Sequence, residues 1–182
     1  MKPKLNKVSP LRKRDYESVE QIHSLNIVHN DLKCDSILVG AQGNAKIIDF
    51  GLSFIPDVAE IQVDPKKMGA LHWKSPEYLT GERPAIATDI YSLAMCILEV
   101  LTDDIPWRKN TINAAVRFRV KKGIISNCTK VLNDTQWNLV RLMTKTDPSQ
   151  RVKIGFVVDK LDEIVRDGAR KASMEQGPLL PP

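Results

Sequence analysis

Apolar residues recur at helical spacing in five segments of the chain. In residues 152–167 they fall at every third or fourth position, which is typical of an amphipathic helix with one buried face. Residues 87–101 are apolar on nearly all sides and therefore predict the central buried helix. Taken together, the pattern predicts helices over these ranges: 14–25, 87–101, 111–122, 134–145 and 152–167.

Residues that favour helix ends flank several of these segments. Pro76 directly follows Ser75, which predicts a further short helix that begins at this proline. Asp134 is the expected N-cap of the helix over 134–145, because its carboxylate can accept an exposed backbone N–H. Gly123 and Gly168 predict the ends of the helices that precede them.

A strand-like pattern is confined to the region before residue 50. Residues 37–39 and 45–48 are short apolar runs, and residues 40–44 between them have the composition of a turn, so we expect a β-hairpin. Residues 52–74 show no regular spacing of apolar residues and contain two prolines. This pattern predicts a long loop, and long loops in compact domains often serve a function.

These elements predict a mainly helical domain of the α+β class with one small hairpin. The chain has 182 residues, enough for one buried core, and its 42% apolar and 27% charged residues are typical of a globular protein. We divide it into three parts: a basic flexible leader over 1–13, the domain over 14–167 and a disordered tail over 168–182.

The absence of a visible targeting signal and the cysteine pattern suggest a reducing compartment. No apolar run reaches membrane length and the N-terminus lacks an apolar signal segment, so we expect no membrane contact. Cys34, Cys96 and Cys128 are odd in number and far apart, which predicts neither a disulfide framework nor a zinc site. We therefore expect a cytoplasmic protein.

The net charge of +5 comes from the first residues of the chain. Residues 1–14 hold six basic residues and no acidic one, so the rest of the chain is nearly neutral. This distribution argues against a basic face on the domain, and we expect no nucleic-acid partner.

Two carboxylates flank the predicted hairpin and suggest phosphate chemistry. Asp31 and Asp49 lie on loops before and after it, with Lys33 beside the first. One carboxylate can accept a hydroxyl proton, the second can hold Mg²⁺, and the cation can neutralise a phosphoryl group.

Five motifs in order resemble those of the eukaryotic protein kinases. The match covers residues 14–167 and comprises the stretch 27–39, Asp49-Phe50-Gly51, Ser75-Pro76-Glu77, Asp89-Ile90-Tyr91-Ser92 and Asp147-Pro148-Ser149-Gln150-Arg151. Asp31-Leu32-Lys33 is similar to the serine/threonine type, and Trp73 with Met95-Cys96 is similar to the tyrosine-kinase-like branch.

The resemblance implies a role for five residues of the candidate site. Asp31 would be the catalytic base and Lys33 would contact the transferred phosphate of ATP. Asp49 would bind Mg²⁺, with Ser36 at the position of a second metal ligand. Leu38 would lie beneath the adenine ring.

The resemblance also implies structural roles outside the chemistry. Asp89 would hold the backbone of the catalytic loop, and Glu77 would form a buried ion pair with Arg151. His29 and Phe50 would stack within the apolar spine of the domain.

Several positions depart from the family pattern. Residues 1–28 contain no glycine and no strand lysine of the V-A-I-K type, so we expect that the N-terminal lobe is absent. Ser36 replaces a metal-binding asparagine. Asn30 replaces the arginine of H-R-D, and Ser53 is the only hydroxyl between Gly51 and Ser75, which predicts no switch by loop phosphorylation.

Two functions remain open at this point. The first is phosphoryl transfer from ATP to serine or threonine hydroxyls of a protein substrate, by a kinase domain of which this chain is a part. The alternative is a non-catalytic, pseudokinase-like module that binds a kinase or a kinase substrate through exposed apolar residues near Leu38 and Phe50. Because residues 1–28 lack the glycine-rich loop and the strand lysine that bind ATP in the family, it stays open whether this chain is an enzyme.

Overall fold

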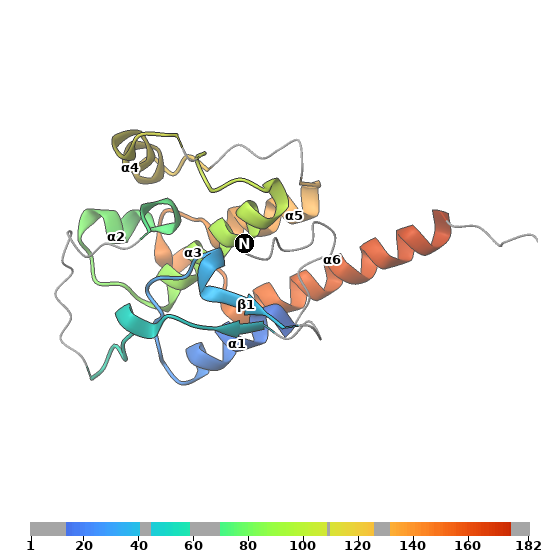
Figure 1. Cartoon of the computed structure of the whole chain (residues 1–182), viewed down its shortest axis with the longest axis horizontal. Helices are drawn as coiled ribbons and strands as arrows, with labels where there is room; N and C mark the ends of the chain where they lie inside the picture. Colours follow the sequence, from blue (N-terminus) through green and yellow to red (C-terminus); the bar gives the residue numbers. More distant parts are fainter. Residues whose placement is uncertain (1–13, 41–44, 59–69, 109, 126–131, 176–182) are drawn as a thin grey trace, which may run out of the picture.

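Helix α3 (Ile86–Thr102) forms the centre of the molecule in the computed structural model (Figure 1). The structure describes residues 14–40, 45–58, 70–108, 110–125 and 132–175. All eleven residues from Thr88 to Leu98 are buried, as expected for a helix that is apolar on nearly every side. The central position that the sequence predicts for this helix is confirmed.

The remaining helices are arranged around α3. They are α1 (Arg14–Ser24), α2 (Pro76–Thr80), α4 (Asn113–Lys121), α5 (Asp134–Met143) and α6 (Ile154–Glu175). Short 3-10 helices connect them at Cys34–Ser36 (η1), Phe50–Leu52 (η2), Leu71–Trp73 (η4) and Pro148–Gln150 (η5). The apolar faces of α1, α3, α5 and α6 contribute to one continuous core.

Strands β1 (Ile37–Val39) and β2 (Ala45–Ile47) form the predicted antiparallel hairpin, with Leu38 opposite Lys46. The hairpin is attached to α1, because Ser18 Oγ donates a hydrogen bond of 2.8 Å to the carbonyl oxygen of Ala45. The described residues form a mainly helical domain with one small hairpin, which confirms the predicted fold class.

Two predicted helix ends are wrong. The N-cap of α5 is Asn133 and not Asp134: Asn133 Oδ1 accepts the backbone N–H of Gln136, whose side chain returns a bond to Asn133 N. Helix α6 also continues past Gly168 to residue 175, so part of the predicted disordered tail is helical. A glycine costs a helix only about 1 kcal/mol, and the residues that follow are good helix formers.

Some of the predictions lie outside the described residues. These are the basic leader over 1–13, the tip of the hairpin, the middle of the long loop and the last residues of the tail. Within the described residues, no helix combines the length and the apolar composition needed to cross a membrane.

Candidate active site

One buried carboxylate on α3 holds the backbone of the loop between α1 and η1. Asp89 is fully buried and accepts the backbone N–H groups of His29 and Asn30, at 2.7 and 2.8 Å. Its Oδ2 atom also lies 3.1 Å from Nε2 of His23, on the last turn of α1. The expected role of Asp89 as the support of this loop is confirmed.

Asn30 has a left-handed backbone conformation, with φ of 65°. Asparagine tolerates this region better than most residues do. Its Nδ2 atom donates to the carbonyl oxygen of Leu52 at 3.3 Å, and its own carbonyl accepts from Lys74 Nζ at 2.6 Å. The loop is therefore fixed from two sides at the residue that precedes Asp31.

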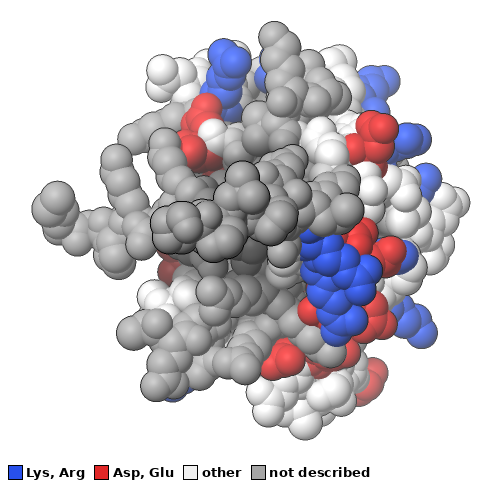
Figure 2. Space-filling view, turned by 90° about the vertical axis from the view of Figure 1, so that its right-hand side faces the viewer, with Lys and Arg blue, Asp and Glu red and all other residues white. Residues whose placement is uncertain are grey.

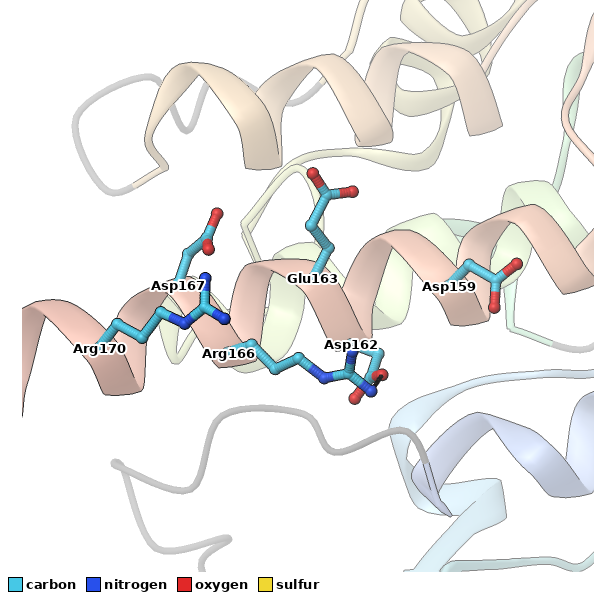
Figure 3. Close-up of a pocket in the computed structure, with 6 residues that line it drawn as sticks. All are labelled: Asp159, Asp162, Glu163, Arg166, Asp167 and Arg170. Carbon is cyan, nitrogen blue, oxygen red and sulfur yellow. Dashed lines mark ion pairs between the residues drawn. The ribbon is translucent and has the colours of Figure 1, made fainter.

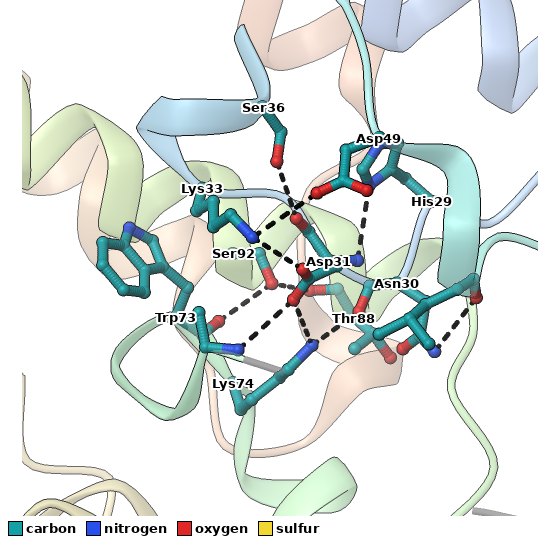
Figure 4. Close-up of polar contacts among 12 residues, drawn as sticks. His29, Asn30, Asp31, Lys33, Ser36, Asp49, Trp73, Lys74, Thr88 and Ser92 are labelled. Carbon is teal, nitrogen blue, oxygen red and sulfur yellow. Dashed lines mark hydrogen bonds and ion pairs between the residues drawn. The ribbon is translucent and has the colours of Figure 1, made fainter. Parts of the chain in front are cut away.

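The carboxylate of Asp31 lies between two lysines (Figure 4). Lys33 Nζ is 2.9 Å from Oδ2, and Lys74 Nζ is 3.1 Å from Oδ1. The backbone N–H of Ala70 also points to Oδ1, at 3.4 Å. Each carboxylate oxygen is thus engaged by a different cation.

These contacts determine the charge of Asp31. Burial raises the pKa of its carboxyl, but the hydrogen bond from Lys33 and the charge of Lys74 outweigh burial and hold the pKa below the ordinary range. The hydrogen bond to Asp31 in turn raises the pKa of Lys33, whereas burial lowers the pKa of Lys74. Asp31 is therefore ionised at neutral pH and can accept a proton or a hydrogen bond.

Lys33 connects Asp31 to the second predicted carboxylate. Its Nζ lies 3.6 Å from Oδ2 of Asp49. Asp49 has a left-handed backbone, with φ of 69°, and its side chain is 56% exposed. The structure thus brings together the three residues that the sequence analysis singled out for phosphate chemistry, and it leaves Asp49 accessible to a ligand.

The other two predicted site residues differ in accessibility. Ser36 is fully buried, and its hydroxyl donates to the carbonyl oxygen of Asp31 at 3.1 Å. Leu38 on β1 is 53% exposed and presents apolar surface next to the loop. In this conformation Ser36 stabilises the loop, and Leu38 is open to a partner molecule.

His29 and Phe50 are in contact, as expected. Their rings meet edge to face, with centroids 5.1 Å apart. His29 Nε2 also lies 3.0 Å from the carbonyl oxygen of Ile48. These contacts join the loop that carries Asp31 to the segment that carries Asp49.

The ion pair between Glu77 and Arg151 is present and buried. Arg151 Nη2 is 2.6 Å from Oε2 of Glu77, and Nη1 is 2.7 Å from Oε1. Thr88 donates a further hydrogen bond to Oε1, at 3.2 Å. Burial raises the pKa of Glu77, but Arg151 outweighs burial and keeps the pKa below its ordinary value. The expected buried ion pair is confirmed.

Lys74 is the site residue that the sequence analysis missed. It lies in the predicted long loop, directly before the Ser75-Pro76-Glu77 triplet, where hydropathy marks a lysine as a surface residue. The structure buries it, with 2% of its surface exposed. The only signal in the sequence was its position next to a motif, and that position does not predict a contact with Asp31.

A hollow of about 470 Å³ on α6 is a less suitable site (Figure 3). Its lining consists of charged residues of one helix: Asp159, Asp162, Glu163, Arg166, Asp167 and Arg170. Arg166 pairs with Asp162 at 2.6 Å, one helical turn away. Figure 2, which views the molecule from the side toward which α6 points, shows basic side chains beside acidic ones. This arrangement is typical of a hydrated helix face.

Comparisons with known proteins find sequence similarity to probable serine/threonine-protein kinases. "Probable serine/threonine-protein kinase mkcE" of Dictyostelium discoideum is 33% identical over 151 residues, which are 79% of this chain and 20% of that protein. "Probable serine/threonine-protein kinase mkcC" of the same organism is 30% identical over 144 residues, 74% of this chain and 15% of that protein. "Probable serine/threonine-protein kinase PknB" of Lactococcus lactis is 26% identical over 161 residues, 87% of this chain and 25% of that protein.

The chain therefore spans a quarter or less of the length of these relatives. A family model described as the protein kinase domain matches residues 7–161. That range includes Asp31, Asp49, the Glu77–Arg151 ion pair and the support from Asp89. Because the family model matches most of its length, the chain belongs to the protein kinase family and comprises part of a kinase domain.

Proposed function

We propose that this chain is the C-terminal lobe of a serine/threonine protein kinase, and that it supplies the base that accepts the proton of the substrate hydroxyl during phosphoryl transfer. One observation supports the proposal above the others. Asp31 is ionised and held by cations on both oxygens, and Asp49 lies on the far side of Lys33. A base, a phosphate-binding cation and an accessible metal-binding carboxylate are the groups that this reaction needs.

Each of these residues has a distinct task in the proposal. Asp31 accepts the proton of a serine or threonine hydroxyl as that hydroxyl attacks. Lys33, whose side chain is 23% exposed, leaves Asp31 to neutralise the transferred phosphoryl group. Asp89 and the ring of His29 keep the loop in place during both steps.

ATP and Mg²⁺ fit one part of the site better than another. Asp49 is half exposed and lies beside Lys33, so it fits the role of a Mg²⁺ ligand. Ser36 fits less well, because its hydroxyl is buried and donates to a backbone carbonyl. When bound, Mg²⁺ neutralises charge on the ATP phosphates. The exposed side chain of Leu38 is the apolar surface available to an adenine ring.

Three finer assignments belong to the same proposal. Trp73 with Met95-Cys96 supports the tyrosine-kinase-like branch. The helical fold, with a hairpin as its sheet in the described residues, supports the C-terminal lobe. Cys34 and Cys96, free in the structure, agree with a reducing compartment, and we place the protein in the cytoplasm.

The proposal is tested on the gene product that contains these residues, with ATP, Mg²⁺ and myelin basic protein as a generic acceptor. We expect Asp31→Asn to lower the rate of phosphoryl transfer at least 100-fold, because general-base catalysis contributes about 10²–10⁴ in rate. Asp159→Asn, an exposed position on α6, is the matched control and should leave the rate unchanged. Equal rates in the parent and Asp31→Asn would contradict the proposal.

The second candidate is a pseudokinase-like module that binds a kinase or a kinase substrate. Exposed apolar side chains favour it, namely Leu38 at 53%, Val39 at 43% and Phe50 at 45%. A thermal-shift titration with Mg²⁺-ATP separates the two functions. Stabilisation that Asp49→Ala abolishes supports the kinase. A flat titration, together with a rate that does not depend on Asp31, supports the module.

A further inference from the structure

Lys74 is buried more completely than Lys33, the other lysine that contacts Asp31. It follows η4 and precedes α2, and its side chain is 2% exposed. Its ammonium donates to the carbonyl oxygen of Asn30 at 2.6 Å and to Oδ1 of Asp31 at 3.1 Å. It also lies 4.9 Å from the centre of the Tyr78 ring, within range of a cation–π contact.

A buried ammonium is costly unless partners compensate for the lost water. Both of the oxygens that compensate Lys74 belong to consecutive residues of the loop, Asn30 and Asp31. The lysine therefore connects the segment before α2 directly to the catalytic loop. Two further contacts hold this segment in place: Ala70 N lies 3.4 Å from Asp31 Oδ1, and Ser92 Oγ donates to Trp73 O at 2.8 Å.

The two lysines on Asp31 differ in their freedom to move. Lys33 is 23% exposed and has a second carboxylate, Asp49, within 3.6 Å. Lys74 is enclosed, and its polar contacts are all with the loop. When Lys33 turns toward a phosphate, Oδ2 of Asp31 loses its cation and Oδ1 keeps one. Lys74 Nζ and the backbone N–H of Ala70 then remain on Oδ1, and Lys74 supplies the charge that orients the carboxylate.

We propose that Lys74 is a positioning residue that holds the Asp31 carboxylate in its proton-accepting orientation while Lys33 binds the transferred phosphate. This inference rests on the proposed kinase function. It assigns to one side chain two tasks, the orientation of the base and the attachment of the segment before α2 to the loop. The Lys74 side chain is enclosed and bonded to Asp31, so its effect on the reaction passes through Asp31.

The test compares Lys74→Met, which keeps the length of the side chain and removes its charge, with Lys145→Met, an exposed control. We expect Lys74→Met to lower kcat at least tenfold with the KM values for ATP and myelin basic protein unchanged. In an Asp31→Asn background the same change should cost no further rate. An unchanged kcat, or an equal loss in both backgrounds, would overturn the proposal.

Two further measurements separate this inference from protein folding and from the proposed function. If Lys74→Met does not fold, Lys74→Gln replaces it under the same criteria, because it retains a donor for the Asn30 carbonyl. If Asp31→Asn leaves the rate unchanged, the kinase function fails and hydrogen exchange of the folded chain decides. Lost protection in Lys74→Met over both 29–34 and 70–74 supports the tether, and loss confined to 70–74 overturns it.

Discussion

Asp31 and Glu77 are both buried carboxylates that pair with cations, yet their surroundings differ. Glu77 receives both of its ion-pair contacts from a single guanidinium, Arg151, and this pair is closed to solvent. Asp31 divides its two oxygens between Lys33 and Lys74, and one of these lysines reaches solvent. A bidentate pair holds two segments in one fixed geometry, whereas a divided pair lets one cation leave without freeing the carboxylate.

The largest expected effect breaks the closed pair. Glu77→Gln leaves the Arg151 guanidinium buried without its counter-ion and should lower the free energy of unfolding by about 3–5 kcal/mol. Urea denaturation followed by circular dichroism measures it. Glu163→Gln, whose pair with Lys160 is half exposed, is the control and should change stability by about 1 kcal/mol or less. Equal effects would show that the closed pair has no special weight.

Acid should weaken the same pair to a smaller extent. Burial raises the pKa of Glu77, but Arg151 lowers it by a larger amount. The pKa of Glu77 in the folded chain therefore lies below the unfolded value of about 4.3. Its contribution is therefore complete above that value and is lost as the pH falls through the folded pKa. Unfolding curves between pH 7 and pH 3 should show a smaller loss for Glu77→Gln than for the parent. Parallel losses would contradict this assignment.

A contact outside both regions gives a scale for these effects. Asn133 caps α5 through the N–H of Gln136 at 2.9 Å. Asn133→Ala should lower the free energy of unfolding by about 1 kcal/mol. Thermal melts of this variant and of Asn133→Asp, which preserves the cap, provide the measurement. A loss in Asn133→Asp as large as that in Asn133→Ala would show that the cap is not the cause.

The smallest expected effect on stability sharpens the comparison from the other side. Lys33→Met removes the partly exposed cation of the divided pair, and Lys74 continues to compensate Asp31. We expect the free energy of unfolding to change by less than about 1 kcal/mol, although phosphoryl transfer falls. A loss as large as that of Glu77→Gln, measured by urea denaturation, would mean that the divided pair is as rigid as the closed one.

Residues that belong to the ordered motifs were predictable even where their partners are distant in the sequence, and a residue outside the motifs was not. Asp89, Glu77 and Arg151 lie in motifs whose order identifies the family, so their partners were expected correctly. The roles of Asp31, Lys33, Asp49, Ser36 and Leu38 in catalysis and binding stay predictions. Lys74 escaped notice because it lies outside these motifs, and no local pattern shows that a carboxylate 43 residues away compensates its charge.

Helix ends show the same limit at short range. Asn133 and Asp134 are both good capping residues, and only the reciprocal bonds with Gln136 select the first. Gly168 resembles a helix end, but a glycine ends a helix only where the backbone turns to positive φ, as at Gly123 with φ of 65°. No positive φ is found at Gly168, and good helix formers carry α6 further.

Helix α6 is packed along its first half and hydrated along its second. Ile154, Val157, Val158 and Leu161 are buried, whereas every residue from 166 to 170 is exposed. The free energy of local opening should therefore fall along this one helix, from the cooperative core to an end that frays. Amide hydrogen exchange along α6 should change from global to local opening within a few turns. The position of that change would show how far the cooperative unit of this domain extends.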